Sequence, residues 1–392
     1  MTAPGPRAGL LRQRVPAAHA RVTNVELFFD LVFVFAVTQV SHALLEHPDG
    51  LGALRAGMLF LAVWWVWVYT AWATNFLDPD RAPIRILLFG MMLAGLVLAT
   101  ALPAAFDGRG LAFALAYVVM QVGRTAFLVA AIGPGDPALR RNFLRVLAWL
   151  ALAAPFWVAG GLLEGHARLA LWGAALAIEY LSPAVYFWTP GLGRSSTTDW
   201  RVEGAHLAER CSLFVIIALG EALLVTGATF AALPWDAPHA AAFGIAFLGS
   251  AAMWWVYFHI GAERGAETIA RSADPGRMAR LGYTYLHLLV VAGIVVAAVG
   301  DEMLLHHPEG TASPATLHCI IGGPALYLLG LALFKRLSLG WLPLSHLFGL
   351  ACLAALAATA PLLPALALAG LANATLVLVA VWEHVSLKGR AA

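Results

Sequence analysis

Stretches of about 20 apolar residues follow one another along almost the whole chain, and each is long enough to cross the hydrocarbon core of a bilayer as a helix. No segment between them exceeds roughly 25 residues, which is too short to build an independent hydrophobic core. The chain of 392 residues is 61% hydrophobic and only 12% charged, whereas an ordinary soluble chain carries about 25% charged residues. The sequence therefore predicts an all-α, polytopic membrane protein without a separate soluble domain.

The apolar stretches predict about 12 transmembrane helices. Six are expected in the first half of the chain, near residues 24–45, 53–77, 83–105, 111–132, 143–163 and 168–189. Six more are expected near residues 205–231, 238–262, 277–303, 314–337, 341–359 and 362–385. Pro361 and Pro364 lie between the last two, so the sequence leaves open a kinked or re-entrant segment there.

The positions of the basic residues predict an orientation, because Lys and Arg are retained on the cytoplasmic side of short loops. With both termini placed inside, 19 of the 24 Lys and Arg residues fall in inside segments. Only Arg55, Arg109 and Arg168 fall outside, and Arg124 and Arg210 lie within spans. We therefore expect a multi-pass protein of the bacterial inner (cytoplasmic) membrane, with its N- and C-termini in the cytoplasm.

The two halves of the chain resemble each other. Residues 24–45 can be aligned with residues 206–227 at an offset of 182, and Trp64–Trp67 matches Trp254–Tyr257 next in order along the chain. Because six spans separate each matched pair, the halves would share one orientation in the membrane. Parallel repeats are typical of transport proteins, although a duplication kept for folding alone would leave the same pattern.

The duplication predicts the domain organisation. The expected segments are a cytoplasmic N-terminal tail (1–22), a first six-helix repeat (23–195), a second six-helix repeat (196–387) and a cytoplasmic tail (388–392).

The predicted helix 205–231 carries a polar stripe. Glu221 follows Arg210 by 11 residues, which places it roughly 16 Å deeper, near the bilayer midplane. Eleven residues are close to three turns, so His206, Arg210 and Glu221 share one face. Because a charge at the helix centre costs about 2.5 to 3.5 kcal/mol, each such group is expected to pair, line a wet cavity or act. We predict that Glu221 takes up and releases a proton or cation.

The matching first helix is chemically different. Glu26 and Asp30 are four residues apart and share a face near the cytoplasmic end, whereas Gln39, the counterpart of Glu221, points to the opposite side. Asp30 is a natural partner for Arg210 or Arg124. A structural ion pair between helices is the alternative to a role in transport.

Other polar and aromatic residues within spans are weaker candidates. Glu179 is predicted mid-span just before Pro183, where a kink would free backbone carbonyls. His287 is predicted near the midplane, and a lone histidine there is more often packed and hydrogen-bonded than a ligand. The neighbouring tryptophans at 64, 65 and 67 predict that at least one faces lipid and another faces the bundle.

The segment from Asp301 to Glu309 is expected to be a solvated outer loop. It contains two acids besides Asp301 and two histidines, but it lacks the spacing of a defined metal site. The chain also has no Walker loop, dinucleotide turn, nucleophile elbow or zinc-protease motif. We therefore predict no metal, no cofactor, no catalytic residues and no nucleic-acid partner.

Two long motifs resemble the bacterial low temperature requirement protein A family. They are VELFFDLVFV at residues 25–34, and HLAER at 206–210 running into IIALGE at 216–221. The resemblance extends over nearly the whole chain and includes the Trp-rich second helix with Asn75. It implies an integral membrane protein named for a role in growth in the cold. Because that name is a phenotype, it implies neither a substrate nor a mechanism.

A second resemblance concerns Phe29-Asp30 and the apolar residues after it. They resemble the Phe-Ser-Asp signature that opens the first helix of the lysosomal potassium channel family. Here Phe29 replaces the serine, and Cys211-Ser212 stands in the second half where an aspartate would be needed. These departures argue against a potassium pore.

The sequence favours a transporter or channel for a small solute or ion, embedded in the lipid bilayer. A membrane-embedded enzyme acting on a lipid-like substrate through Glu221, His287 and Arg124 is an alternative, and a non-transporting sensor or scaffold is another. An enzyme is the less favoured class, and the oligomeric state is not indicated. The predicted polar pathway consists of Glu221, Arg210, His206, Asp30, Glu26, Gln39, Arg124, His287 and Glu179.

Overall fold

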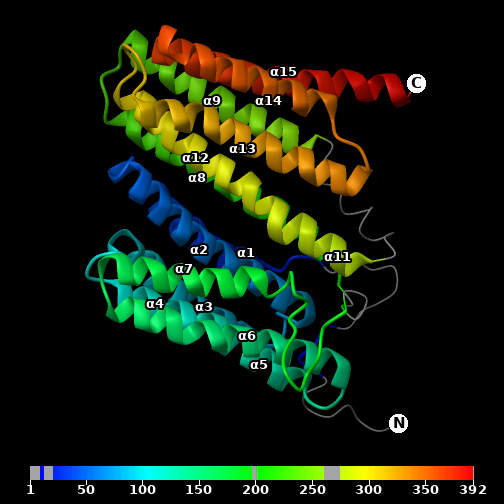
Figure 1. Ribbon diagram of the computed structural model, residues 1–392. Helices are drawn as coiled ribbons and strands as arrows, with labels where there is room; N and C mark the ends of the chain where they lie inside the picture. The colour runs from blue at the N-terminus through cyan, green and yellow to red at the C-terminus, as the bar shows by residue number, and fades with distance from the viewer. Residues whose placement is uncertain (1–8, 13–20, 197–199, 201, 260–273, 392) are drawn as a thin grey trace. The chain divides into compact units, whose positions relative to one another are not determined.

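The computed structural model describes residues 9–12, 21–196, 200, 202–259 and 274–391. These residues form helices joined by short connections, and no strand occurs among them. The predicted all-α class is therefore confirmed (Figure 1). Of the basic residues used for the orientation, Arg7, Arg14, Arg201, Arg264 and Arg271 lie outside the described residues.

In the described part of the chain, 11 helical segments are long and apolar enough to cross a membrane. A twelfth helix, α7, has 17 residues. The helices are α1 (Asn24–Glu46), α2 (Gly50–Phe76), α3 (Ala82–Ala101), α4 (Gly110–Val118), α5 (Arg124–Ile132), α6 (Pro137–Leu162), α7 (Gly165–Leu181), α8 (Gly204–Ala231), α9 (Ala237–Phe258), α11 (Pro275–Ala279), α12 (His287–His306), α13 (Pro314–Leu339), α14 (Leu344–Thr359) and α15 (Ala365–Ala391).

Two of the spans contain a turn of π-helix. Residues Val119–Gly123 join α4 to α5, and Arg280–Leu286 join α11 to α12. A π-turn shifts the side chains that follow it around the helix axis and often marks a functional site. Arg124 and His287, two of the predicted site residues, each come directly after such a turn.

Side-chain caps fix where several helices begin. Asp136 accepts a hydrogen bond from the Leu139 amide at the start of α6, and Ser313 accepts one from the Thr316 amide at the start of α13. Asp236 caps α9 in the same way through the His239 amide. The hydrogen bonds from the His239 backbone and side chain lower the pKa of Asp236. Each cap satisfies an amide that has no partner within its helix.

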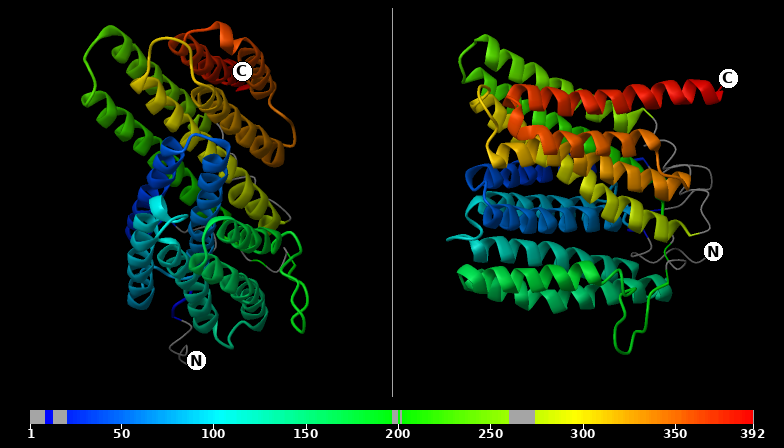
Figure 2. Two further views of the ribbon diagram at one scale, coloured as in Figure 1. Left: turned by 60° about the vertical axis from the view of Figure 1, so that its left-hand side comes forward. Right: turned by 45° about the horizontal axis from the view of Figure 1, so that its top comes forward.

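The chain divides into two compact units. Unit 1 comprises residues 1–43, 50–210 and 273–279, and unit 2 comprises residues 44–49, 211–272 and 280–392. Within unit 1, α6 packs against both α4 and α7, and these helices run side by side in both views of Figure 2. Within unit 2, α12 lies along α13, and α15 packs against α9 and α14.

Glycines bring α12 and α13 into close contact. A methyl group added at Gly293 would lie 2.5 Å from the backbone nitrogen of Tyr327, and one at Gly323 would lie 2.5 Å from that of Ala297. Such contacts require one of the helices to move. Small residues that allow close backbone approach are typical of helix interfaces in membranes.

The segment around Pro361 forms a connection between two separate helices. Helix α14 ends at Thr359, a short 3-10 turn covers Ala360–Leu362, and α15 begins at Ala365. Both stretches are long and apolar enough to span a membrane. The segment is therefore two separate helices, and each is long enough for a full span.

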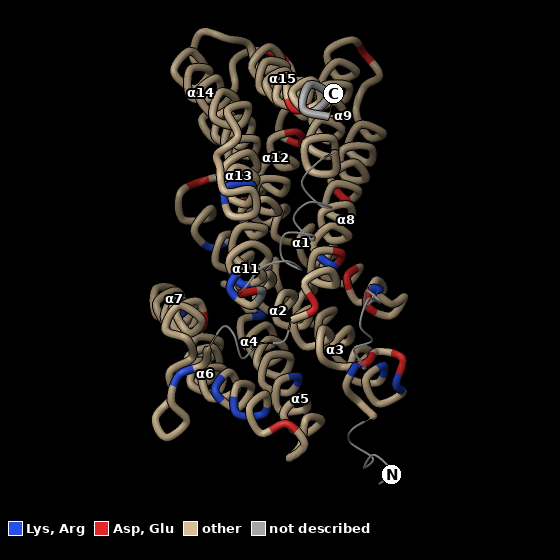
Figure 3. The backbone as a smooth tube through the Cα atoms, turned by 90° about the vertical axis from the view of Figure 1, so that its right-hand side faces the viewer, with Lys and Arg blue, Asp and Glu red and all other residues tan. Residues whose placement is uncertain are grey.

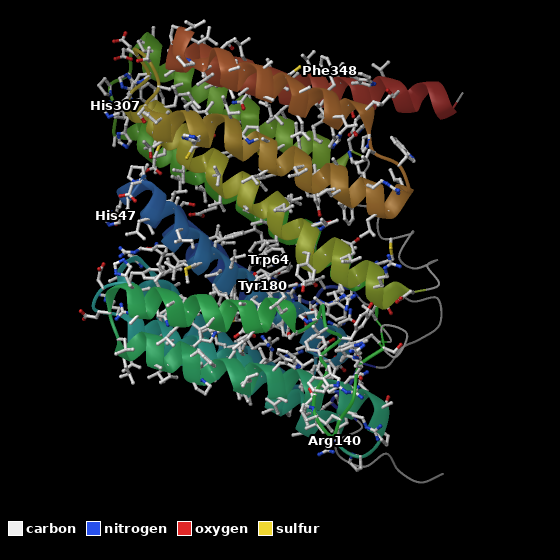
Figure 4. The ribbon with its side chains drawn as sticks, viewed as in Figure 1. His47, Trp64, Arg140, Tyr180, His307 and Phe348 are labelled. Atoms are coloured by element: carbon white, nitrogen blue, oxygen red, sulfur yellow. The ribbon has the colours of Figure 1, made fainter. Side chains whose placement is uncertain are left out.

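The prediction that a tryptophan of α2 faces lipid is wrong. Trp64, Trp65 and Trp67 are 2%, 0% and 0% exposed. Neighbouring helix positions point about 100° apart, so the prediction assumed that α2 lies at the edge of its bundle, whereas α5 and α7 both pack on it. Tyr180 of α7, labelled in Figure 4, stacks on Trp65 with ring centroids 3.9 Å apart. The aligned Trp254 of α9 is 47% exposed, so the two matched segments differ in environment.

Candidate functional site

The largest group of buried charges joins the start of α1 to the start of α8. Glu26 Oε1 lies 2.9 Å from His206 Nε2 and 3.2 Å from Arg210 Nη1, and Arg210 also donates to Asp30. The other oxygen of Glu26 accepts a hydrogen bond of 2.9 Å from Arg12. The side chains of Glu26, Asp30, His206 and Arg210 are fully buried. We call these five residues the Glu26 cluster.

Neutral side chains of α2 complete the Glu26 cluster. Trp67 donates to Asp30 at 2.8 Å, and Thr74 accepts from Arg210 at 3.3 Å. Asn75 is oriented by the backbone of Glu203, which accepts from its amide nitrogen and donates to its oxygen. The Asn75 nitrogen therefore faces His206 Nδ1, at 3.3 Å. Nε2 lies 2.9 Å from Glu26 Oε1 and 3.2 Å from Arg12 Nη2. With Nδ1 accepting from Asn75, Nε2–H donates to Glu26, which is the neutral form of histidine.

The Glu26 cluster is balanced in charge. Two carboxylates face two guanidinium groups, and the histidine between them is neutral. A buried ion pair of this kind holds helices in register but loses much stability when one partner is removed. The ion pair expected between Asp30 and Arg210 is present, and its surroundings fit the structural interpretation.

Arg12 belongs to this cluster although the sequence indicated only a basic tail. Its backbone amide donates to the Phe76 carbonyl at 2.8 Å, and its guanidinium reaches the Thr74 carbonyl at 2.7 Å. The segment from Leu10 to Arg12 thus lies along the end of α2. No periodic signal marks such an extended segment, so sequence reasoning missed it.

Glu179 is the centre of a second buried network, within unit 1. Tyr117 and Trp157 donate to its carboxylate, the latter at 2.9 Å, and Gln121 donates at 3.3 Å. The oxygen of Gln121 accepts a 2.6 Å hydrogen bond from Arg124. The groups that donate directly to Glu179 are therefore neutral. The nearest cation, Arg124, is connected to Glu179 only through Gln121.

Glu179 lies near the end of its helix and not in the middle of it, as the predicted span implied. Helix α7 ends at Leu181, two residues later, and Pro183 belongs to the turn that follows. Proline disfavours the helical conformation of the residue before it, so it ends the helix instead of kinking it. The predicted span was too long at this end because residues 182–189 remain mostly apolar.

His287 is a packed histidine, in agreement with the simpler expectation for a lone histidine. Its Nε2 lies 2.9 Å from the Tyr257 hydroxyl and its Nδ1 lies 2.8 Å from the Gly282 carbonyl. Tyr283 and Phe334 contact its ring. Both nitrogens are therefore engaged within unit 2.

The remaining predicted site residues are less enclosed. Glu221 in α8 and Gln39 in α1 are both half-buried. Glu221 and His287 belong to unit 2, whereas Arg124 belongs to unit 1. The roles predicted for Glu221 and Gln39 stay predictions.

A further buried ion pair, within unit 2, escaped the sequence reasoning. Lys335 of α13 lies 2.7 Å from Glu383 of α15, and His346 of α14 lies within 3.4 Å of both. Lys335 is one of the 19 basic residues counted in inside segments, but it lies within α13 and is 3% exposed. Charged residues just before a loop look like loop residues in a hydropathy pattern, which explains the error.

Comparison with known proteins identifies the family. The model of the bacterial low temperature requirement A protein (LtrA) matches residues 21–381. The chain belongs to the LtrA family. It is also 44% identical over 366 residues to an uncharacterized protein of Rhizobium meliloti (strain 1021), a match that covers 93% of this chain and 89% of that protein. No solved structure matches the chain.

The two motifs that resemble the LtrA family meet in the structure. The motif at 25–34 supplies Glu26 and Asp30, and the motif at 206–210 supplies His206 and Arg210, so the Glu26 cluster is built from both. Asn75, from the Trp-rich second helix, contacts the same cluster. The spans and the family together establish a multi-pass membrane protein in a lipid bilayer.

Proposed function

We propose that this LtrA-family protein moves a small solute or ion across the membrane, and that an intramembrane carboxylate takes up a proton during the cycle. The observation that carries the proposal is the setting of Glu179. This carboxylate is 2% exposed and accepts hydrogen bonds from neutral side chains only. An acid in the membrane interior is costly to ionise and is a functional candidate by default.

The surroundings of Glu179 allow its charge to change without breaking an ion pair. The titratable or charged groups around it are Tyr117, Arg124 and Tyr180, and Tyr69 lies beside Arg124. Gln121 links Glu179 to Arg124, so loss or gain of a proton at Glu179 alters the field at the guanidinium. Gln121 belongs to the π-turn of this span, where the helix geometry departs from the α-form. By contrast, the Glu26 cluster has its charges already matched.

We expect Glu179→Gln to reduce proton-linked flux at least 10-fold, because glutamine keeps the size of the side chain but cannot exchange a proton. The full-length protein is reconstituted into vesicles that contain a pH-sensitive dye. The internal pH is followed under a potassium diffusion potential, with Na⁺, K⁺ or a mixture of amino acids outside. Glu164→Gln, at an exposed position before α7, should leave the flux unchanged.

A wild-type flux retained in Glu179→Gln would remove Glu179 from the mechanism. If the wild-type protein does not change the internal pH of the vesicles under any of these conditions, the second candidate is favoured. That candidate is a non-transporting scaffold. The sealed and balanced Glu26 cluster is the observation that favours this candidate, because it provides rigidity without a path for an ion.

We also propose the orientation and repeat organisation that the sequence predicts. Both termini would lie in the cytoplasm of a bacterial cell, with two six-helix repeats at residues 23–195 and 196–387. The basic residues near the start of α6, including Arg140, support this orientation, and Figure 3 shows basic residues along α6.

A fusion at the C-terminus tests the orientation. We expect green fluorescent protein to fluoresce there and alkaline phosphatase to be inactive, because the first folds in the cytoplasm and the second only after export. A matched pair of fusions in the connection at Gly310, between α12 and α13, should give the reverse result. Active phosphatase at the C-terminus would contradict the proposal.

A further inference from the structure

A small cavity lies inside unit 2, among helices α8, α9, α12, α13 and α15. Its polar lining includes the side chains of Asp301, Ser250 and Asn373. The space open to the centre of a water-sized occupant is about 10 Å³, which is close to the minimum needed to hold one water molecule. The cavity therefore suits a single small occupant.

Asp301 lies in helix α12 and not in the solvated loop that the sequence predicted. Helix α12 continues to His306, five residues further on. Within the described residues, the Asp301 carboxylate has no hydrogen bond or ion pair to another side chain or to the backbone. Asp301 itself is half-buried, whereas the buried carboxylates Glu383 and Glu26 have close partners. Asp301 is the exception, and it lines a cavity.

Neutral oxygen atoms accompany this carboxylate. Pro324 lies inside α13 and has no N–H to donate to the Ile320 carbonyl four residues earlier, and both residues line the cavity. That carbonyl is therefore released from the helix ladder. Asn373 donates its amide nitrogen to the Ile245 carbonyl at 2.8 Å, which leaves its oxygen as the group available to an occupant. Ser250 adds a hydroxyl.

The position of Asn373 depends on a glycine. A methyl group at Gly249 would lie 2.6 Å from the Asn373 side chain, so only glycine leaves room for it there. The asparagine thus lies closely against α9, next to Gly249 and hydrogen-bonded to the Ile245 carbonyl one turn earlier. These contacts keep the Asn373 side chain in one orientation, which a ligand-binding group requires.

We propose that the cavity beside Asp301 binds one monovalent cation, Na⁺, with a proton competing for the same carboxylate. Asp301, Asn373 and Ser250 offer oxygens, which hard cations prefer. The lining has no cysteine or histidine, and Met253 contributes its one thioether. One carboxylate balances one positive charge, and a bound ion relieves the cost of a half-buried anion without a partner. The claim that this Na⁺ is coupled to transport rests on the proposed function. The binding itself does not.

Equilibrium binding of radioactive Na⁺ to the purified full-length protein in detergent tests the site without any flux. We expect saturable binding of one ion per chain above a choline background, weakened as the pH falls. Asp301→Asn should weaken binding at least 10-fold, because it removes the charge and keeps the shape. Glu302→Gln removes the neighbouring carboxylate, which does not line the cavity, and should leave binding unchanged.

Gly249→Ala gives a second, independent measurement if Asp301→Asn folds poorly. It displaces Asn373 without touching the carboxylate and should also weaken binding several-fold. A folded wild-type protein that binds no Na⁺ would overturn the proposal, as would binding of protons alone or equal binding by Asp301→Asn. Loss of flux with intact Na⁺ binding would instead contradict only the proposed function.

Discussion

Replacing Arg210 with methionine is expected to destabilise the protein by about 3 to 5 kcal/mol. Arg210 is fully buried and pairs with both Glu26 and Asp30. The substitution leaves Asp30 facing only Trp67, so an anion is buried without a countercharge. The unfolding midpoint in detergent, followed by tryptophan fluorescence, should fall by roughly 10 °C.

Two further variants make this expectation specific to the charge. Asp30→Asn combined with Arg210→Met should recover at least half of the lost stability, because Glu26 then keeps Arg12 as its partner. Arg85→Met breaks the exposed pair with Asp80, whose side chains are 49% and 73% exposed, and should cost no more than about 1 kcal/mol. If Arg210→Met proves as mild as Arg85→Met, the cluster does not stabilise the fold.

The Glu26 cluster also shows what helical periodicity can predict. The four-residue spacing of Glu26 and Asp30 places them on one face of α1, and the same spacing places His206 and Arg210 on one face of α8. Opposite charges on two such faces predict a pair, which the structure contains. Periodicity says nothing about extended segments, however, so the contribution of Arg12 could not be predicted.

Charged residues close to helix ends limit what a hydropathy pattern can predict. Asp301 and Lys335 lie within the last two turns of α12 and α13, but their polarity placed them with the loops. Glu179 was placed too far from a helix end, because the apolar residues after it suggested a longer span. In each case the helix end is set by local backbone chemistry and packing, which a count of apolar residues does not contain.

The environment of each helix was equally hidden from the sequence. Trp64 and Trp254 lie in matched, similarly apolar segments, yet the first is 2% exposed and the second 47%. A helix with apolar residues all round can sit in the centre of a bundle or at its edge. Only the contacts with neighbouring helices decide between these positions. Those contacts cannot be predicted from the apolar pattern of a single sequence.

Those contacts are closest between α12 and α13, and here we expect Gly323→Ala to destabilise unit 2 by about 3 kcal/mol. The new methyl group would lie 2.5 Å from the backbone nitrogen of Ala297 and 2.8 Å from its Cβ. Because the nearest atoms belong to backbone and to a side chain without rotamers, the strain can be relieved only by moving one helix. The unfolding midpoint in detergent measures the loss.

The adjacent Gly322 provides the matched control, since a methyl group there meets nothing within 4 Å. Gly322→Ala makes the same chemical change one position along α13 and should be neutral or should stabilise the helix by up to about 1 kcal/mol. Equal effects of the two substitutions would contradict the close packing of α12 and α13. Ala297 also lines the cavity beside Asp301, so the movement caused by Gly323→Ala should weaken Na⁺ binding as well, whereas Gly322→Ala should not.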